Sequence, residues 1–235
     1  MMSKIRNSYH VPIVRKARTL ARHLKILNLL KRLLPNSKSY EEPFLSAISL
    51  SVKEGDVVWD VGANQGLYTR LFSEWTGKNG KVVAFEPEPE TFANLSKELQ
   101  SFHGVLLFKK ALADKPGASF FVSEGANDVT AHLISEPKKN TIQVDLTTAD
   151  IVVGLDSSLQ PNVVKIDVEG FEEEVVKGGS ETFNHPDCRH MFIEMHFGAM
   201  EKRKLKDSPN NIVKMLKHWH YRVRWVDASH IHAFR

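Results

Sequence analysis

The 235-residue sequence contains a single cysteine and lacks any long apolar run. With only Cys188, the chain cannot form an internal disulfide, which agrees with a reducing compartment. No apolar stretch approaches the roughly 18 residues that a transmembrane helix needs. No apolar signal region precedes a small-residue cleavage site. These absences favour a cytoplasmic globular protein, in agreement with an apolar content of 42%.

Acidic side chains are missing from residues 1–40, which contain ten lysines and arginines. The rest of the chain carries 22 basic and 28 acidic residues, so a basic segment precedes an acidic body. Leucines recur at three- and four-residue steps over residues 14–34, which predicts an amphipathic helix. We therefore expect residues 1–38 to form a basic helical arm and residues 39–235 to form the main domain.

Several interpretations of this arm stay open. Its leucine face can pack on the main domain or support self-association with a second copy of the chain. Alternatively, the helix can lie on an anionic membrane surface, so that the protein is peripheral at a membrane. An arginine-rich, acid-poor segment is also typical of organelle targeting. Nucleic acid is the least favoured partner, because no aromatic side chains stand between the charges.

The dinucleotide-binding pattern G-x-G-x-x-G is absent, but a related strand, loop and helix begin with VVWDVGANQG, residues 57–66. Gly62 and Gly66 tolerate a left-handed backbone and leave room for a ligand; alternatively, they only serve a tight turn. A second apolar run ends in Glu86, at the spacing where an acid accepts hydrogen bonds from ribose hydroxyls. Asp60 lies where a cationic amine could pair with it. S-adenosylmethionine, an adenosine joined to an amino acid, fits these features better than a pyrophosphate ligand.

Apolar runs alternate with helical patterns along the chain, which predicts an α/β fold with a mostly parallel sheet covered by helices on both faces. The expected strands are residues 57–60, 81–86, 105–111, 163–167 and 191–196, and the expected helices are 42–50, 67–75, 91–102, 172–178 and 212–218. The alternation of strands and helices is interrupted by two short strand-like runs, 119–123 and 141–146. They predict an inserted hairpin or flap around a polar loop, 124–140. Runs at 221–226 and 231–234 predict a closing hairpin that adds an antiparallel strand.

Acids and a histidine follow two of the later strands. In an open parallel sheet, ligands gather outside the carboxyl ends of the strands, and neighbouring strands lie about 4.8 Å apart. Asp167, Glu194 and His196 are therefore candidate catalytic residues, and Glu169 lies among them in the sequence. A carboxylate or imidazole can take the proton of an attacking hydroxyl. A divalent cation held by Asp167 and Glu194 could instead lower the pKa of that hydroxyl. Simpler interpretations are a strand-end cap for Asp167 and packing for His196.

Other acids and histidines have ordinary explanations. Glu172, Glu173 and Glu174 place favourable negative charge in a first helical turn. Two H-x-H pairs, at residues 218–220 and 230–232, lack accompanying acids in the sequence, so a metal role is not favoured there.

Taken together, six blocks of sequence resemble the FkbM family of S-adenosylmethionine-dependent methyltransferases. They occur in family order from about residue 55 to residue 197, and the block that begins with VVKIDVEG is the most specific. The blocks are VWDVGANQGLYT, VVAFEPEPETFANL, KKALAD, VDLTTAD, VVKIDVEGFEEEVVKGG and FIEMHF. The resemblance implies a Rossmann-like seven-stranded sheet whose last strand is antiparallel. It also implies O-methylation of a hydroxyl, often on a sugar, glycan or natural product.

The resemblance implies roles for individual residues as well. The cofactor contacts would be Asp60, Gly62, Asn64, Gly66 and Glu86, with Ala111 and Leu112 beside the adenine. Asp167 and Glu194 would face the reaction centre. Two other functions stay open: a non-catalytic cofactor-binding or scaffolding protein that kept the fold, and an NAD-dependent dehydrogenase.

Overall fold

The computed structural model describes residues 42–122, 132–134 and 141–235. The predicted arm helix at 14–34 and nearly all of the predicted loop at 124–140 lie outside these residues. The chain divides into two compact units, residues 1–50 and 51–235. The first unit contains most of helix α2 (Glu42–Ser51), which confirms the helix predicted at 42–50. No helix among the described residues is long and apolar enough to cross a membrane.

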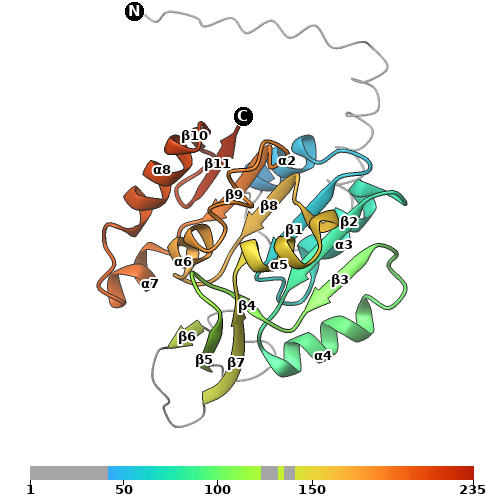
Figure 1. Ribbon diagram of the computed structural model, residues 1–235, viewed down its shortest axis with the longest axis horizontal. Helices are drawn as coiled ribbons and strands as arrows, with labels where there is room; N and C mark the ends of the chain where they lie inside the picture. Colours follow the sequence, from blue (N-terminus) through green and yellow to red (C-terminus); the bar gives the residue numbers. More distant parts are fainter. Residues whose placement is uncertain (1–41, 123–131, 135–140) are drawn as a thin grey trace, which may run out of the picture. The chain divides into compact units, whose positions relative to one another are not determined.

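The second unit is built on a seven-stranded sheet (Figure 1). In spatial order its strands are β10 (Arg222–Trp225), β11 (His230–Phe234), β9 (His190–Glu194), β8 (Val163–Ile166), β1 (Val57–Val61), β2 (Lys81–Phe85) and β3 (Val105–Phe108). The pairings from β9 to β3 are parallel, and β11 is antiparallel to both neighbours. This order confirms the predicted sheet and closing hairpin. Because β2 and β8 lie on opposite sides of β1, the carboxyl ends of β1 and β8 form the switch point where such folds bind ligands.

Helices cover both faces of this sheet, as predicted. Side chains alternate between the faces along a strand, so Trp59 and Val61 of β1 pack in one cluster with Val175 and Leu216. On the other face, Ala84 of β2 packs with leucines of α4 and its C-terminal end. Besides α2, the helices and the single 3-10 turn of the described residues are α3 (Leu67–Thr76), α4 (Pro89–Glu98), α5 (Ala149–Leu155), η1 (Ser157–Leu159), α6 (Glu172–Lys177), α7 (Phe197–Lys202) and α8 (Ser208–His218).

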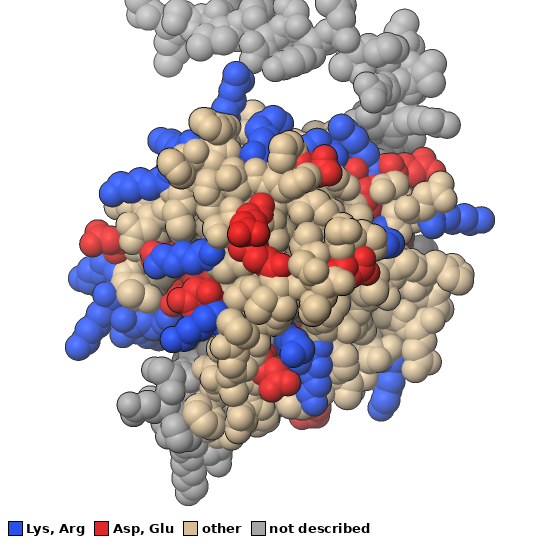
Figure 2. Space-filling view, in the orientation of Figure 1, with Lys and Arg blue, Asp and Glu red and all other residues tan. Residues whose placement is uncertain are grey.

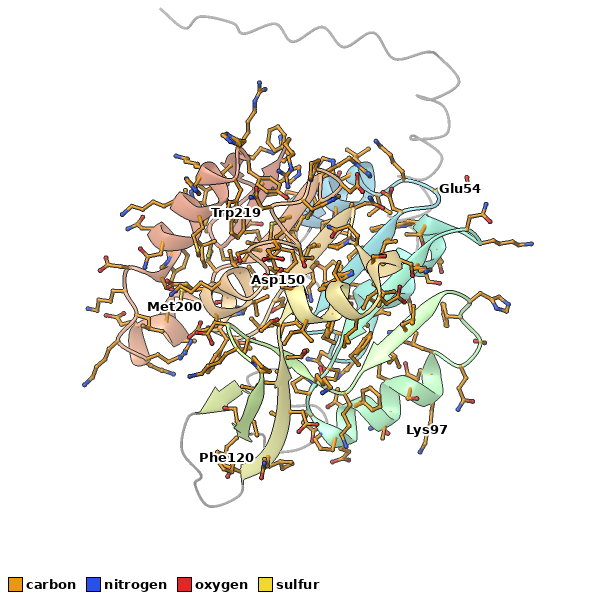
Figure 3. The ribbon with its side chains drawn as sticks, viewed as in Figure 1. Glu54, Lys97, Phe120, Asp150, Met200 and Trp219 are labelled. Carbon is orange, nitrogen blue, oxygen red and sulfur yellow. The ribbon has the colours of Figure 1, made fainter. Side chains whose placement is uncertain are left out.

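The larger core extends into the C-terminal part of the chain. Met200 of α7 and Trp219, which follows α8, are buried members of this cluster (Figure 3). A buried hydrogen bond joins β1 to η1, because the Trp59 indole N–H donates to the Leu159 carbonyl at 2.8 Å. The carboxyl end of β1 is therefore anchored by a packed core.

A second, four-stranded sheet replaces the simple hairpin that the sequence predicts. Its order is β4 (Ala111–Leu112), β7 (Thr141–Thr147), β5 (Gly117–Val122) and β6 (His132–Ile134), and it lies at the bottom of Figure 1. The antiparallel pairing of β5 with β7 confirms the hairpin. Two details of the prediction are wrong. The polar loop at 124–140 contains a strand, β6, and the strand at 105–111 breaks after Phe108, because β4 pairs with β7 instead.

Candidate active site

The loop after β1 packs closely against its own sheet. Gly62 and Gly66 have left-handed φ angles of 82° and 75°, and Asn64 has a φ of 47°. A Cβ at Gly62 would lie 1.9 Å from the Asp167 backbone oxygen, and one at Gly66 would lie 2.3 Å from Leu95. Glycine is thus required because the loop approaches other parts of the protein. This supports the tight-turn explanation for the two glycines, and the contact of the loop with a ligand stays a prediction.

Glu86 follows β2 and lies beside this loop. The residue is 6% exposed, and its carboxylate accepts hydrogen bonds from the backbone N–H groups of Asn64 (2.9 Å) and Glu88 (2.8 Å). Burial raises the pKa of Glu86 to about 7, against the lowering effect of these two donors. Each carboxylate oxygen has a second lone pair, so the group can accept two further hydrogen bonds. A ribose diol is a donor pair of this kind.

Asp60 is buried at the end of β1, and its charge is balanced from within the protein. Its Oδ2 accepts from the Thr69 hydroxyl at 2.6 Å, and its Oδ1 lies 3.2 Å from Lys165 Nζ. The pairing of β1 with β8 places Asp60 directly opposite Lys165. We therefore revise the expected pairing of Asp60 with a ligand amine, because a lysine of the chain already holds that position.

Lys165 connects this carboxylate to the second cluster. Its ammonium donates to the Gly62 carbonyl at 3.0 Å and lies 3.2 Å from Asp167 Oδ2. Burial alone would lower the pKa of Lys165, but Asp167 and Asp60 raise it above its ordinary value. Sequence reasoning missed this residue, because the register of two strands far apart in the chain is not visible in the sequence.

His196 lies among four carboxylates. Its Nδ1 is 2.7 Å from Glu172 Oε1, and its Nε2 is 3.4 Å from Glu169 and 3.6 Å from Asp167. Glu194 is more distant, with Oε1 at 4.0 Å from Nε2. Burial opposes charge on the ring, but Glu169 and Glu172 raise the pKa of His196 to about 11. The structure thus brings the predicted residues Asp167, Glu194 and His196 together.

Glu172 belongs to this cluster as well, although its sequence position suggested only a first-turn charge. It is fully buried, and its Oε1 also accepts from the Gly170 backbone N–H at 3.0 Å. A carboxylate on the far nitrogen of a histidine fixes the orientation of the ring. No signal in the sequence separated Glu172 from Glu173 and Glu174, which share the same turn.

Glu194 has a second histidine partner, His230 of β11. Strand pairing places His230 opposite Glu194, with Nε2 at 3.2 Å from Glu194 Oε2. Its Nδ1 lies 2.8 Å from Asp227. The expectation that this H-x-H pair lacks acids is therefore wrong in three dimensions. The other member, His232, stacks on Phe192 instead, with ring centroids 4.1 Å apart.

The residues that can hold a cation differ from the predicted pair. Within the described part of the chain, one group offers three ligand atoms within 4.8 Å of one another: Asp167, Glu169 and His196. Oxygen and imidazole donors suit a divalent cation. Glu169, rather than the predicted Glu194, completes this group.

The predicted adenine segment, Ala111 and Leu112, is buried in β4. It lies shortly after β3, and the last β3 residue, Phe108, accepts a hydrogen bond from the Glu86 backbone N–H at 3.1 Å. The segment thus leaves the large sheet next to Glu86, and its contact with an adenine stays a prediction.

A separate hollow of about 610 Å³ lies among α6, α7 and α8. Its lining includes Glu173, Lys177 and Lys206 but not Glu86, Asp167 or Glu194. On the face shown in Figure 2, lysines and arginines gather over α7 and α8 with acids between them. This mixed-charge hollow is distinct from the candidate active site.

Comparisons with known proteins found one matching family domain and two similar proteins. Residues 60–223 match the methyltransferase FkbM domain. The chain is 28% identical over 177 residues to the hexuronic acid methyltransferase AglP of Haloferax volcanii, covering 75% of this chain and 67% of that protein. It is 24% identical over 188 residues to the 2-O-methyltransferase NoeI of Sinorhizobium fredii, covering 69% and 77% of the two chains.

One solved structure shows the same fold at low identity. The methyltransferase FkbM of Methylobacillus flagellatus superposes with a TM-score of 0.52 at 14% identity, over 94% of this chain. The present chain spans 60% of that longer protein.

Proposed function

Because the chain belongs to the FkbM family of S-adenosylmethionine-dependent methyltransferases, we propose that it transfers a methyl group to a hydroxyl of a saccharide. The observation that carries the proposal is the arrangement at one edge of the sheet. A buried carboxylate suited to a ribose diol follows β2, and the carboxylates of Asp167 and Glu194 lie at the ends of β8 and β9. The two similar proteins named for hexuronic acid and 2-O-methylation support a saccharide acceptor.

In this proposal the cofactor lies across the carboxyl ends of β1 and β2. Glu86 would accept hydrogen bonds from the ribose hydroxyls. The backbone of the loop from Gly62 to Gly66 would face the rest of the ligand. Asp60 would act indirectly, by holding Lys165 and through it the Gly62 carbonyl. The buried carboxylate of Glu86 supports this fit, because each of its oxygens accepts one backbone hydrogen bond and keeps a lone pair for a ribose hydroxyl.

When bound, S-adenosylmethionine would supply an electrophilic methyl group on a sulfonium, and the electron pair of the broken C–S bond would stay on sulfur as a neutral thioether. The acceptor hydroxyl must be aligned with that methyl and must lose its proton as the new C–O bond forms. The hydroxyl becomes much more acidic at this stage, so a carboxylate can accept its proton. Asp167 and Glu194 are suited to this task, since each side chain is 30% exposed and is held by cationic neighbours.

His196 is proposed as a positioning residue rather than as the base. Glu172 faces one of its ring nitrogens and Glu169 the other, so in its protonated form both N–H groups have acceptors. The charged ring then balances carboxylates that would otherwise repel one another. A divalent cation on Asp167, Glu169 and His196 would replace that proton and lower the pKa of the acceptor hydroxyl.

The test is a methylation assay with S-adenosylmethionine and a panel of saccharides that includes free and linked hexuronic acids. A gain of about 14 Da on a saccharide, detected by mass spectrometry, is the expected result. Asp167→Asn should lose the gain, whereas Asp187→Asn, a change of the same kind on a 66% exposed side chain, should keep it. Methylation of a non-saccharide hydroxyl alone would reject the acceptor class. Failure to bind S-adenosylmethionine would reject the whole proposal.

A further inference from the structure

Two aromatic side chains stand exposed next to the candidate active site. Phe197 is 45% exposed and Trp225 is 50% exposed, and no other phenylalanine, tyrosine or tryptophan that the structure describes is as exposed. The rings stack on each other, with centroids 6.0 Å apart and an interplanar angle of 26°. Their exposed parts therefore form one continuous apolar patch that water still reaches.

Chain connectivity places this surface beside the acids. Phe197 directly follows His196 and begins α7. Trp225 ends β10, which runs in the same direction as β9, so it lies at the carboxyl edge of the sheet. The chain turns back after Trp225, and the Val226 N–H donates to the His230 carbonyl at 2.8 Å. His230 in turn contacts Glu194. The aromatic pair thus borders the Glu194 side of the cluster.

A ligand that covers an exposed aromatic pair gains binding free energy, because burial of aromatic surface is a large driving force. A stable protein interface buries about 800 Å² on each partner, which two half-exposed rings do not supply. A pyranose ring matches the surface better, since one of its faces carries C–H groups and its edge carries hydroxyls. The C–H face can lie on the aromatic rings while the hydroxyls reach the acids.

We propose that Phe197 and Trp225 form the platform on which a sugar ring of the acceptor lies, with one hydroxyl directed to Asp167 and Glu194. This inference rests on the proposed function, in which the acceptor is a saccharide. The platform sets the position and orientation of the ring, and it leaves cofactor binding to the loop and Glu86.

Intrinsic fluorescence provides a direct binding test that does not depend on turnover. The other tryptophans, Trp59, Trp75 and Trp219, are 0%, 3% and 7% exposed, so the solvent-accessible signal comes from Trp225. Titration of the full chain with the saccharide that the methylation assay identifies as the acceptor should shift or quench this signal. Trp225→Phe should remove this change in fluorescence, because the three remaining tryptophans are buried.

The kinetic test uses Phe197→Ala and Trp225→Ala. Each should raise KM for the saccharide by about tenfold or more and leave the dissociation constant of S-adenosylmethionine unchanged. Leu155→Ala is the matched control, because Leu155 is 85% exposed and lies at the end of α5.

The outcomes separate the platform from the proposed function. An unchanged KM in both aromatic variants would overturn the platform while saccharide methylation by the wild type still stands. A shift in oligomeric state, seen by light scattering in these variants, would assign the surface to a second copy instead and overturn the inference. If the wild type neither methylates saccharides nor shows a fluorescence response to them, the proposed function and the platform both fail.

Discussion

Glu86 gives a prediction in which stability and cofactor binding change in opposite directions. Its pKa is about 7 in the folded protein and near 4.5 when unfolded. The folded state therefore holds this proton more tightly, and stability falls as pH rises from 4.5 through 7. Above pH 7 the ionised, buried carboxylate should lower the unfolding free energy by about 3 kcal/mol, because a tenfold change in an ionisation constant corresponds to about 1.36 kcal/mol.

Glu86→Gln removes this titration. The amide keeps one acceptor oxygen and loses one backbone hydrogen bond, which costs about 1 kcal/mol at every pH. The difference in unfolding free energy between variant and wild type should therefore move in favour of the variant by about 3 kcal/mol between pH 4.5 and pH 8. Denaturant unfolding across this range measures the difference. Glu90→Gln is the control, because Glu90 is exposed in the first turn of α4.

Cofactor affinity should show the opposite trend. Ribose hydroxyls need the ionised carboxylate as acceptor. Wild-type affinity for S-adenosylmethionine should therefore fall as the pH is lowered through 7, by roughly tenfold between pH 8 and pH 6. At pH 8, Glu86→Gln and Glu86→Ala should bind at least about tenfold more weakly, from about 1.5–3 kcal/mol for a charged acceptor. Calorimetry at several pH values tests this. Affinity that is independent of pH in the wild type and unchanged in folded variants would remove Glu86 from the cofactor site.

Three further predictions concern the rest of the protein. Asp167→Asn or Glu194→Gln should lower turnover by about 10²-fold with little change in cofactor affinity. Loss of activity with EDTA and its recovery with magnesium would support a bound divalent cation. Full activity after chelation would leave direct proton transfer to a carboxylate. Lys165→Met should cost about 3–5 kcal/mol of unfolding free energy by leaving Asp60 buried without its cation, and a loss below about 1 kcal/mol would contradict the role of that pair. Deletion of residues 1–38 should abolish flotation with anionic vesicles at low salt if the arm binds membranes. Equal, negligible flotation of the full chain with neutral and anionic vesicles would instead favour packing of the arm on the main domain or on a second copy. A dimer-to-monomer shift on deletion would support packing on a second copy.

The sheet could be predicted from the sequence because its central strands are short and largely apolar, with one charged residue each in β1 and β8. The residues of β1 and β8 are almost all buried, as parallel strands with helices on both faces require. Elements without this signal were missed. β6 has three residues in a polar stretch. α7 has six residues, FGAMEK, whose few apolar side chains show no helical period.

Site residues were found where an acid directly follows an apolar run, and they were missed where tertiary contact decides. Glu86, Asp167 and Glu194 fall in the first class. Lys165 and Glu172 fall in the second, because a charged residue inside a strand or a first helical turn has an ordinary explanation until its partner is known.

Lys165 also bears on how the two halves of the site depend on each other. Sequence reasoning separates a cofactor loop after β1 from catalytic acids after β8 and β9. One buried ammonium contacts Asp60, the Gly62 carbonyl and Asp167 at 3.0–3.2 Å, and the Gly62 backbone has no space for a side chain against Asp167. A change that moves the loop must therefore move the acid. Substitutions at Asp60 and Asp167 should accordingly be non-additive in their effects on cofactor affinity and turnover, as expected for residues that share a partner.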